Sequence, residues 1–126
     1  MIGVPKGLLR LAALKLLSES SMSGTDLANE LGRITEGDWD PGPGSVYLVL
    51  KELLKEDLIT ELPRREGNTR RYIISRKGKE ELVSLGEDAE TDVLRQLKLL
   101  GVYSGLAGKK ELSEKIKKSV EGFRSS

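Results

Sequence analysis

Residues 39–55 read Trp-Asp-Pro-Gly-Pro-Gly-Ser-Val-Tyr-Leu-Val-Leu-Lys-Glu-Leu-Leu-Lys, a turn rich in glycine and proline followed by an amphipathic segment. Pro43 suits the first turn of a helix, where its missing N–H breaks no hydrogen bond. The apolar residues recur at positions 3, 4, 7 and 8 after Val46, the spacing of one helical face. We therefore predict a helix over residues 43–56 that buries this face: Val46, Val49, Leu50, Leu53 and Leu54.

The opposite face of this helix carries small, aromatic and basic residues. Tyr47 and Lys51 lie one turn apart, so their side chains project together. By itself such a face is an ordinary solvated surface, but a basic hairpin follows in the sequence and favours DNA contact. The residues of the helix expected at the DNA are Gly44, Ser45, Tyr47, Leu48 and Lys51.

The hairpin is predicted from two β-type runs, residues 58–62 and 70–74, separated by the turn dipeptide Gly67-Asn68. Alternation along the second strand places Tyr72 and Ile74 on one side, with Arg71 and Ile73 on the other. Residues 64–77 hold six basic residues and one acidic residue, a local charge of +5 in a chain of net charge +1. Phosphate contact is expected from Arg64, Arg65, Arg70 and Arg71. The alternative is a solvated strand edge protected by charge.

Two further helices are predicted before this segment. The first spans residues 5–18. The second begins at a capping box formed by Ser23 and Asp26 and continues to about residue 34. Its expected buried residues are Leu27, Ala28, Leu31 and Ile34. Trp39, in the connection that follows, is expected to anchor that loop to the core.

After the hairpin, Ser75 is predicted to cap a fourth helix over residues 76–85, and a separate helix is predicted from residue 87 onward. An apolar stripe of Ala89, Val93, Leu97, Leu100, Tyr103 and Leu106 follows helical spacing, and a last segment repeats it with Leu112, Ile116, Val120 and Phe123. An apolar helix face without a partner usually meets another subunit. We expect a homodimer formed through Val93, Leu97, Leu100 and Tyr103. The alternative is that these helices fold back on the first helix.

The composition excludes several classes of function. The chain of 126 residues has no cysteine and no histidine, which removes disulfides, the usual transition-metal ligands and histidine-based catalysis. The acidic residues lie at salt-bridge spacing on helices, so neither an enzyme nor a cofactor or metal is expected. Arg10 and Lys15 interrupt the N-terminal apolar run, which argues against a signal peptide or a membrane span. A cytoplasmic location is expected by elimination.

Residues 37–53, Leu58-Ile59 and residues 70–79 together resemble the PadR family of transcriptional regulators. The shared pattern is a proline-rich turn, a Gly-Ser-hydrophobic-Tyr helix, a wing and a Tyr-x-x-Thr-x-x-Gly run. This chain departs from it at Thr25 and Leu48, where the family often has tyrosine and proline, and at Ser75, where it has threonine. The first two departures concern details of operator contact and do not affect the fold, whereas Ser75 retains a hydroxyl cap.

The resemblance implies a winged helix-turn-helix fold, mainly α with a small β-hairpin, followed by C-terminal dimerisation helices. Residues 1–85 would form the DNA-binding domain and residues 86–126 the dimerisation region. Ser45 and Tyr47 would lie at the DNA. Some relatives hold a small aromatic effector at the dimer interface, so such an effector is a candidate partner here.

Two functions are therefore weighed. The first is a sequence-specific DNA-binding regulator, a homodimeric repressor that reads a palindromic operator in double-stranded DNA. Its helix 43–56 would enter the major groove, its wing 58–74 would follow the backbone, and the amides near Gly44 and Ser45 would meet a phosphate. The second is a winged-helix module for protein–protein interaction that binds no specific DNA, which the near-neutral net charge favours.

Overall fold

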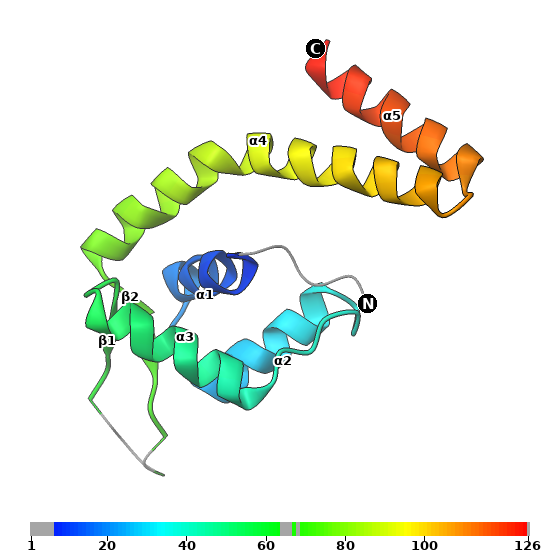
Figure 1. Cartoon of the computed structure of the whole chain (residues 1–126). Helices are drawn as coiled ribbons and strands as arrows, with labels where there is room; N and C mark the ends of the chain where they lie inside the picture. Colours follow the sequence, from blue (N-terminus) through cyan, green and yellow to red (C-terminus); the bar gives the residue numbers. More distant parts are fainter. Residues whose placement is uncertain (1–6, 64–66, 68, 126) are drawn as a thin grey trace. The chain divides into compact units, whose positions relative to one another are not determined.

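The computed structural model describes residues 7–63, 67 and 69–125 (Figure 1). In these residues the elements are α1 (Leu8–Glu19), α2 (Gly24–Ile34), α3 (Pro43–Lys55), β1 (Ile59–Glu61), β2 (Tyr72–Ile74), α4 (Arg76–Leu106) and α5 (Lys110–Arg124). The fold is mainly α-helical with one two-stranded hairpin, which confirms the predicted class. The chain forms two compact units, residues 1–85 and 86–126, and each is described separately.

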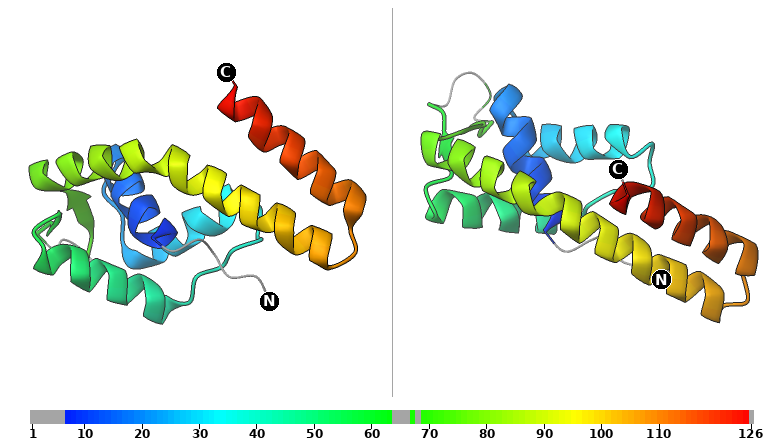
Figure 2. Two further views of the ribbon diagram at one scale, coloured as in Figure 1. Left: turned by 45° about the horizontal axis from the view of Figure 1, so that its top comes forward. Right: turned by 90° about the horizontal axis from the view of Figure 1, so that it is seen from above.

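The first unit is held together by an aliphatic core. Helices α1, α2 and α3 pack on one another, and α1 and α3 also contact the hairpin, as two views in Figure 2 show. The buried side chains come mainly from α1, α3 and the two strands: Ala13, Leu14, Leu16, Leu17, Leu27, Leu31, Val46, Val49, Leu50, Leu53, Leu58, Ile59, Tyr72 and Ile74. Trp39 packs against this core as predicted.

The N-terminal helices differ from the prediction at their ends. Helix α1 begins at Leu8 and ends at Glu19, and Pro5 lies outside the described residues. The capping box of α2 is confirmed: Asp26 N–H donates to Ser23 Oγ and Ser23 N–H donates to Asp26 Oδ2, both at 3.1 Å. The predicted burial of Ile34 is wrong, since 53% of this residue is exposed. It is the last residue of α2, beyond the turn that the core covers.

The hairpin is shorter than predicted. β1 pairs antiparallel with β2 in the register Ile59↔Ile74, Thr60↔Ile73 and Glu61↔Tyr72. Tyr72 and Ile74 are buried while Ile73 is exposed, which confirms the predicted alternation. Tyr72 also exchanges two backbone hydrogen bonds with Met22, of 2.8 and 3.0 Å, so β2 is joined to the α1–α2 connection.

Helix α4 starts where Ser75 Oγ accepts the N–H of Gly78 at 3.0 Å, which confirms the predicted cap. The separation into two helices, over 76–85 and from 87 onward, is wrong, because α4 continues without a break to Leu106. A glycine such as Gly86 lowers helix propensity by about 1 kcal/mol, but without proline it does not end a helix.

In the second unit, α5 packs closely against α4. The hydroxyls of Ser104 and Ser113, both buried, donate to Gly101 O at 2.9 and 2.8 Å. A Cβ on Gly101 would lie 3.1 Å from Ile116 Cγ2, and one on Gly105 would lie 3.1 Å from Ser113 Oγ. The seam between the two helices therefore combines glycine and serine with Ile116 of the predicted apolar stripe. The predicted stripes did not include the glycines and serines.

Gly78 is a position where only glycine fits. A Cβ there would lie 2.0 Å from the carbonyl oxygen of Leu58 and 2.7 Å from Ile74 Cγ1. We predict that Gly78→Ala lowers the free energy of unfolding by more than about 2 kcal/mol, because backbone must move to make room. Urea unfolding followed by circular dichroism measures this.

Gly86→Ala in the same helix is the matched control. A Cβ at Gly86 meets nothing within 4 Å, so alanine should raise stability by about 0.5–1 kcal/mol through helix propensity. Equal stabilities for the Gly78 variant and the parent would contradict the close approach of α4 to β1.

Candidate nucleic-acid interface

Helix α3 divides into a buried and an exposed face at the predicted positions. Val46, Leu50 and Leu53 are at most 2% exposed, whereas Tyr47 is 65% and Leu48 58% exposed. Gly44, Ser45 and Lys51 are also exposed. Lys51 makes no ion pair with any residue that the structure describes. The exposed face therefore carries an aromatic, an aliphatic and a cationic side chain free to meet a ligand.

A polar groove joins this face to the hairpin. The groove has a volume of about 370 Å³ and is lined by Ser23, Gly24, Thr25, Tyr47, Thr69, Arg70 and Tyr72. Three segments thus converge on one surface: the start of α2, the first turns of α3 and the residues leading into β2, which include Arg70. Sequence reasoning missed Thr25 and Thr69. The sequence signal that could have identified them is a threonine close to a helix cap, Thr25, and a threonine next to a pair of arginines, Thr69.

The N-terminus of α3 has few groups that would oppose an anion. Gly42 is its N-cap, Pro43 is the first residue and no acidic residue lies in the first turn. The N–H groups of Ser45 and Val46 already donate to Gly42 O, at 3.1 and 3.2 Å. The N–H group of Gly44 precedes this first intrahelical hydrogen bond, so no carbonyl of the helix accepts from it.

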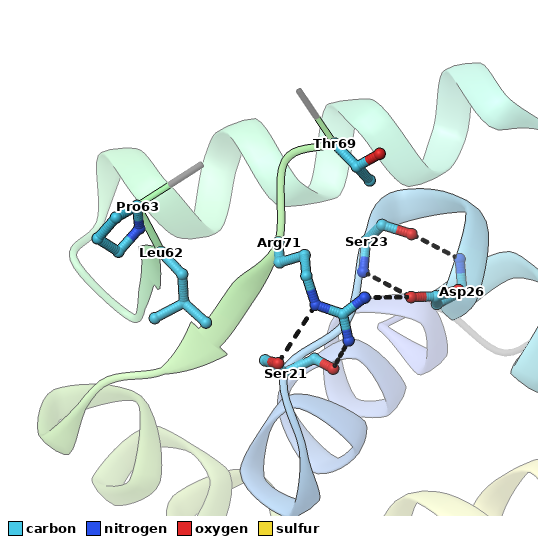
Figure 3. A pocket seen from close by; sticks show the side chains of 7 residues that line it. All are labelled: Ser21, Ser23, Asp26, Leu62, Pro63, Thr69 and Arg71. Carbon is cyan, nitrogen blue, oxygen red and sulfur yellow. Dashed lines mark hydrogen bonds and ion pairs between the residues drawn. The ribbon is translucent and has the colours of Figure 1, made fainter. Parts of the chain in front are cut away.

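The two hairpin arginines that the structure describes, Arg70 and Arg71, have partners inside the protein. Arg70 Nε lies 3.5 Å from Glu61 Oε1. Arg71 donates from Nη2 to Ser21 O at 2.7 Å, and its Nη1 lies 3.3 Å from Asp26 Oδ2 (Figure 3). The local charge of +5 counted only neighbours in sequence and omitted these carboxylates. Arg64 and Arg65 lie outside the described residues.

The C-terminal end of α3 is fixed by an ion-pair network. Arg10 of α1 donates to both oxygens of Glu56, at 2.7 and 3.1 Å, and also lies 3.5 Å from Glu81 of α4. The hydrogen bond from Arg10 lowers the pKa of Glu56 below the ordinary glutamate value, with smaller contributions from the charges of Arg10 and Lys77. The same hydrogen bond raises the pKa of Arg10. The network joins α3 to α1 and α4.

Three helices, the third with an exposed polar face, followed by a hairpin that contacts the core, define a winged helix-turn-helix protein. Residues 13–84 match the model of the transcriptional regulator PadR-like family. The chain therefore belongs to the PadR-like family of transcriptional regulators. Membership of a family of regulators agrees with the expectation that the chain is not an enzyme.

Known relatives agree with this assignment. The chain is 31% identical over 84 residues to the transcriptional regulator YqjI of Escherichia coli, a match that covers 67% of this chain and 40% of that protein. The chain thus spans about two fifths of the length of that relative.

Solved structures share the fold. A PadR-like regulator of Bacillus cereus has a TM-score of 0.63 and 24% identity over 75% of this chain and 93% of that one. Bacillus subtilis PadR, solved in complex with operator DNA, has a TM-score of 0.56 and 20% identity over 94% of this chain and 96% of that one. Within the described residues, no helix has both the length and the apolar character needed to cross a membrane.

The Arg10–Glu56 pair predicts a pH-dependent contribution to stability. Glu56→Gln keeps the shape of the side chain but removes its charge, so we expect a lower midpoint of thermal unfolding at pH 7. Because the folded-state pKa of Glu56 is lowered, its contribution is complete above the ordinary glutamate pKa and is lost as the pH falls through the lowered value. The difference between variant and parent should therefore shrink below about pH 4.

Calorimetry at pH 7 and at low pH provides the measurement. Glu52→Gln, on the exposed surface of the same helix, serves as the control and should leave the midpoint unchanged. A Glu56 variant with the midpoint of the parent at pH 7 would show that the pair does not stabilise the fold.

Proposed function

We propose that this protein binds a specific DNA operator as a homodimer and represses transcription. Helix α3 together with its C-cap, residues 43–56, enters the major groove. The hairpin of residues 58–74 is the wing, and it lies on the phosphate backbone. One observation carries the proposal: Tyr47 of α3 and Arg70 of the wing line the same exposed groove. A duplex that filled the space next to α3 would meet both.

The exposed face of α3 has the chemistry for groove recognition. The major groove of DNA admits a helix, and a thymine methyl group accepts contact with an apolar tip such as Leu48. Lys51 reaches a phosphate or a guanine, and Tyr47 contacts the backbone or a base edge. The positive end of the helix dipole at Gly44 favours a phosphate, which no acidic side chain in the first turn opposes.

The similarity to Bacillus subtilis PadR supports the proposal that this chain binds operator DNA. That protein was solved with operator DNA, and its fold matches nearly the whole of this chain. The PadR-like family assignment covers the core helices and the wing of the first unit. We therefore assign DNA binding to residues 1–85, with the cytoplasm as the place where the chain meets the genome.

Residues 86–126 are proposed to form the dimer. Val93, Leu100 and Tyr103 are 61%, 39% and 56% exposed, and Leu97 is partly exposed, so α4 carries apolar side chains that α5 does not fully cover. A second copy of the chain would bury it. Two such protomers related by a two-fold axis read a palindrome, and a small aromatic effector at the interface would act by favouring a different spacing of the two α3 helices.

A protein–protein interaction module is the second candidate. The observation that favours it is the pairing of the wing: Arg70 and Arg71 have Glu61 and Asp26 as neighbours, in a chain of net charge +1. Such a module would not distinguish the DNA upstream of its own gene from unrelated DNA.

Lys51→Ala tests the proposed DNA contact. We expect the parent to bind DNA from upstream of its gene more tightly than a scrambled duplex. If Lys51 meets a phosphate, the variant loses affinity, and its slope of log K against log salt becomes shallower by about 0.9. Fluorescence anisotropy at several salt concentrations measures both quantities.

Lys15→Ala, at an exposed position of α1, is the matched control for loss of one positive charge and should bind like the parent. Equal affinity of the parent for upstream and scrambled DNA would favour the interaction module instead.

Leu97→Glu combined with Leu100→Glu tests the dimer. Each protomer would then bring two glutamates to the proposed interface, where burying their unpaired charges is unfavourable, so we expect monomers by light scattering. Leu48→Glu is the control: it replaces an exposed leucine of α3 by glutamate, and it should leave the dimer intact while weakening DNA binding. An intact dimer in the double variant would refute this interface.

A further inference from the structure

Arg70 and Arg71 are adjacent in the chain but line different hollows. Arg70 lines the groove that also contains Tyr47. Arg71 lines a second hollow of about 550 Å³, together with Ser21, Ser23, Asp26, Leu62, Pro63 and Thr69 (Figure 3). Successive side chains of an extended strand point to opposite faces, which accounts for the separation. The two guanidinium groups therefore meet different surroundings.

The guanidinium group of Arg71 is used by the protein itself. Its Nη2 donates to the backbone carbonyl of Ser21 at 2.7 Å, its Nε lies 3.4 Å from Ser21 Oγ, and its Nη1 lies 3.3 Å from Asp26 Oδ2. Figure 3 shows the planar group lying against the α1–α2 connection and the first turn of α2. Each of the three nitrogens of the Arg71 guanidinium thus has a partner inside the protein, which fixes the orientation of the group.

The surface that receives Arg71 is itself well fixed. Asp26 is held in the capping box with Ser23, so its carboxylate is oriented before Arg71 approaches. The neighbouring residues are also joined: Met22, which follows Ser21, exchanges two backbone hydrogen bonds with Tyr72, which follows Arg71. The base of the wing is thus attached to the α1–α2 connection by main chain and side chain together.

We infer that Arg71 is a positioning residue that clamps the base of the wing, and that of the two arginines only Arg70 contacts phosphate. The inference rests on the proposed DNA-binding function and gives the two arginines of the wing different roles. A wing that is already placed loses less conformational freedom when DNA binds, so the clamp raises affinity without releasing a counterion from DNA. The flat, forked guanidinium is required at position 71, whereas a positive charge suffices at position 70.

The first experiment compares Arg70→Ala, Arg70→Lys, Arg71→Ala and Arg71→Lys for binding to upstream DNA over a range of salt concentrations. We expect Arg70→Ala to make the salt slope shallower by about 0.9 and Arg70→Lys to restore it. Both Arg71 variants should bind roughly tenfold more weakly with the slope of the parent. A shallower slope for Arg71→Ala that Arg71→Lys restores would overturn the inference.

The second experiment needs no DNA. Amide hydrogen exchange of the free protein, read by NMR, reports on the hydrogen bonds between Met22 and Tyr72. Arg71→Ala and Arg71→Lys should speed the exchange of both amides, while Arg70→Ala should not. Protection equal to that of the parent in both Arg71 variants would refute the clamp. If the parent shows no salt-dependent DNA binding, the proposed function fails, and the exchange result still decides whether Arg71 holds the wing.

Discussion

The burial of one face of α3 is the constraint on which the first unit depends. Val46, Leu50 and Leu53 are almost fully buried among the leucines of α1 and α2, and this fixes the rotation of α3 about its axis. With that rotation fixed, Tyr47, Leu48 and Lys51 can only face outward. Burial of aliphatic side chains therefore does more than stabilise the unit: it selects the residues that are presented to a ligand.

Polar contacts then place the remaining elements relative to α3. Arg10 joins α1 to Glu56 at the end of α3, Ser75 donates to Asp57 O at 2.7 Å, and Gly78 lets α4 approach the carbonyl of Leu58. The wing is attached separately, through Tyr72 and Arg71, to the connection before α2. The exposed groove between Tyr47 and Arg70 results from these two sets of contacts acting together.

Much of this arrangement was predictable from the sequence where local chemistry decides it. The period of the apolar residues predicts α3 and its buried face, and the serine caps predict the starts of α2 and α4. The link between Arg71 and Asp26 was not predictable in this way, because the two residues lie 45 positions apart and charge counts ignore such partners. The break expected in α4 was wrong because Gly86, with no proline beside it, did not outweigh the hydrogen bonds of a long helix. In the seam of α4 and α5, the predicted apolar stripe includes Ile116, but a search for apolar residues does not find the glycines and serines beside it.

This seam has a consequence for genetic screens. At Gly101 and Gly105 a Cβ would lie 3.1 Å from a side-chain atom of α5, so that side chain must shift for alanine and shift further for a larger residue. Alleles with large residues at these two sites are expected to lower the activity read by a reporter assay, although the sites carry no reactive or charged group. Protein abundance measured for each allele would separate such packing defects from defects of the exposed face of α3.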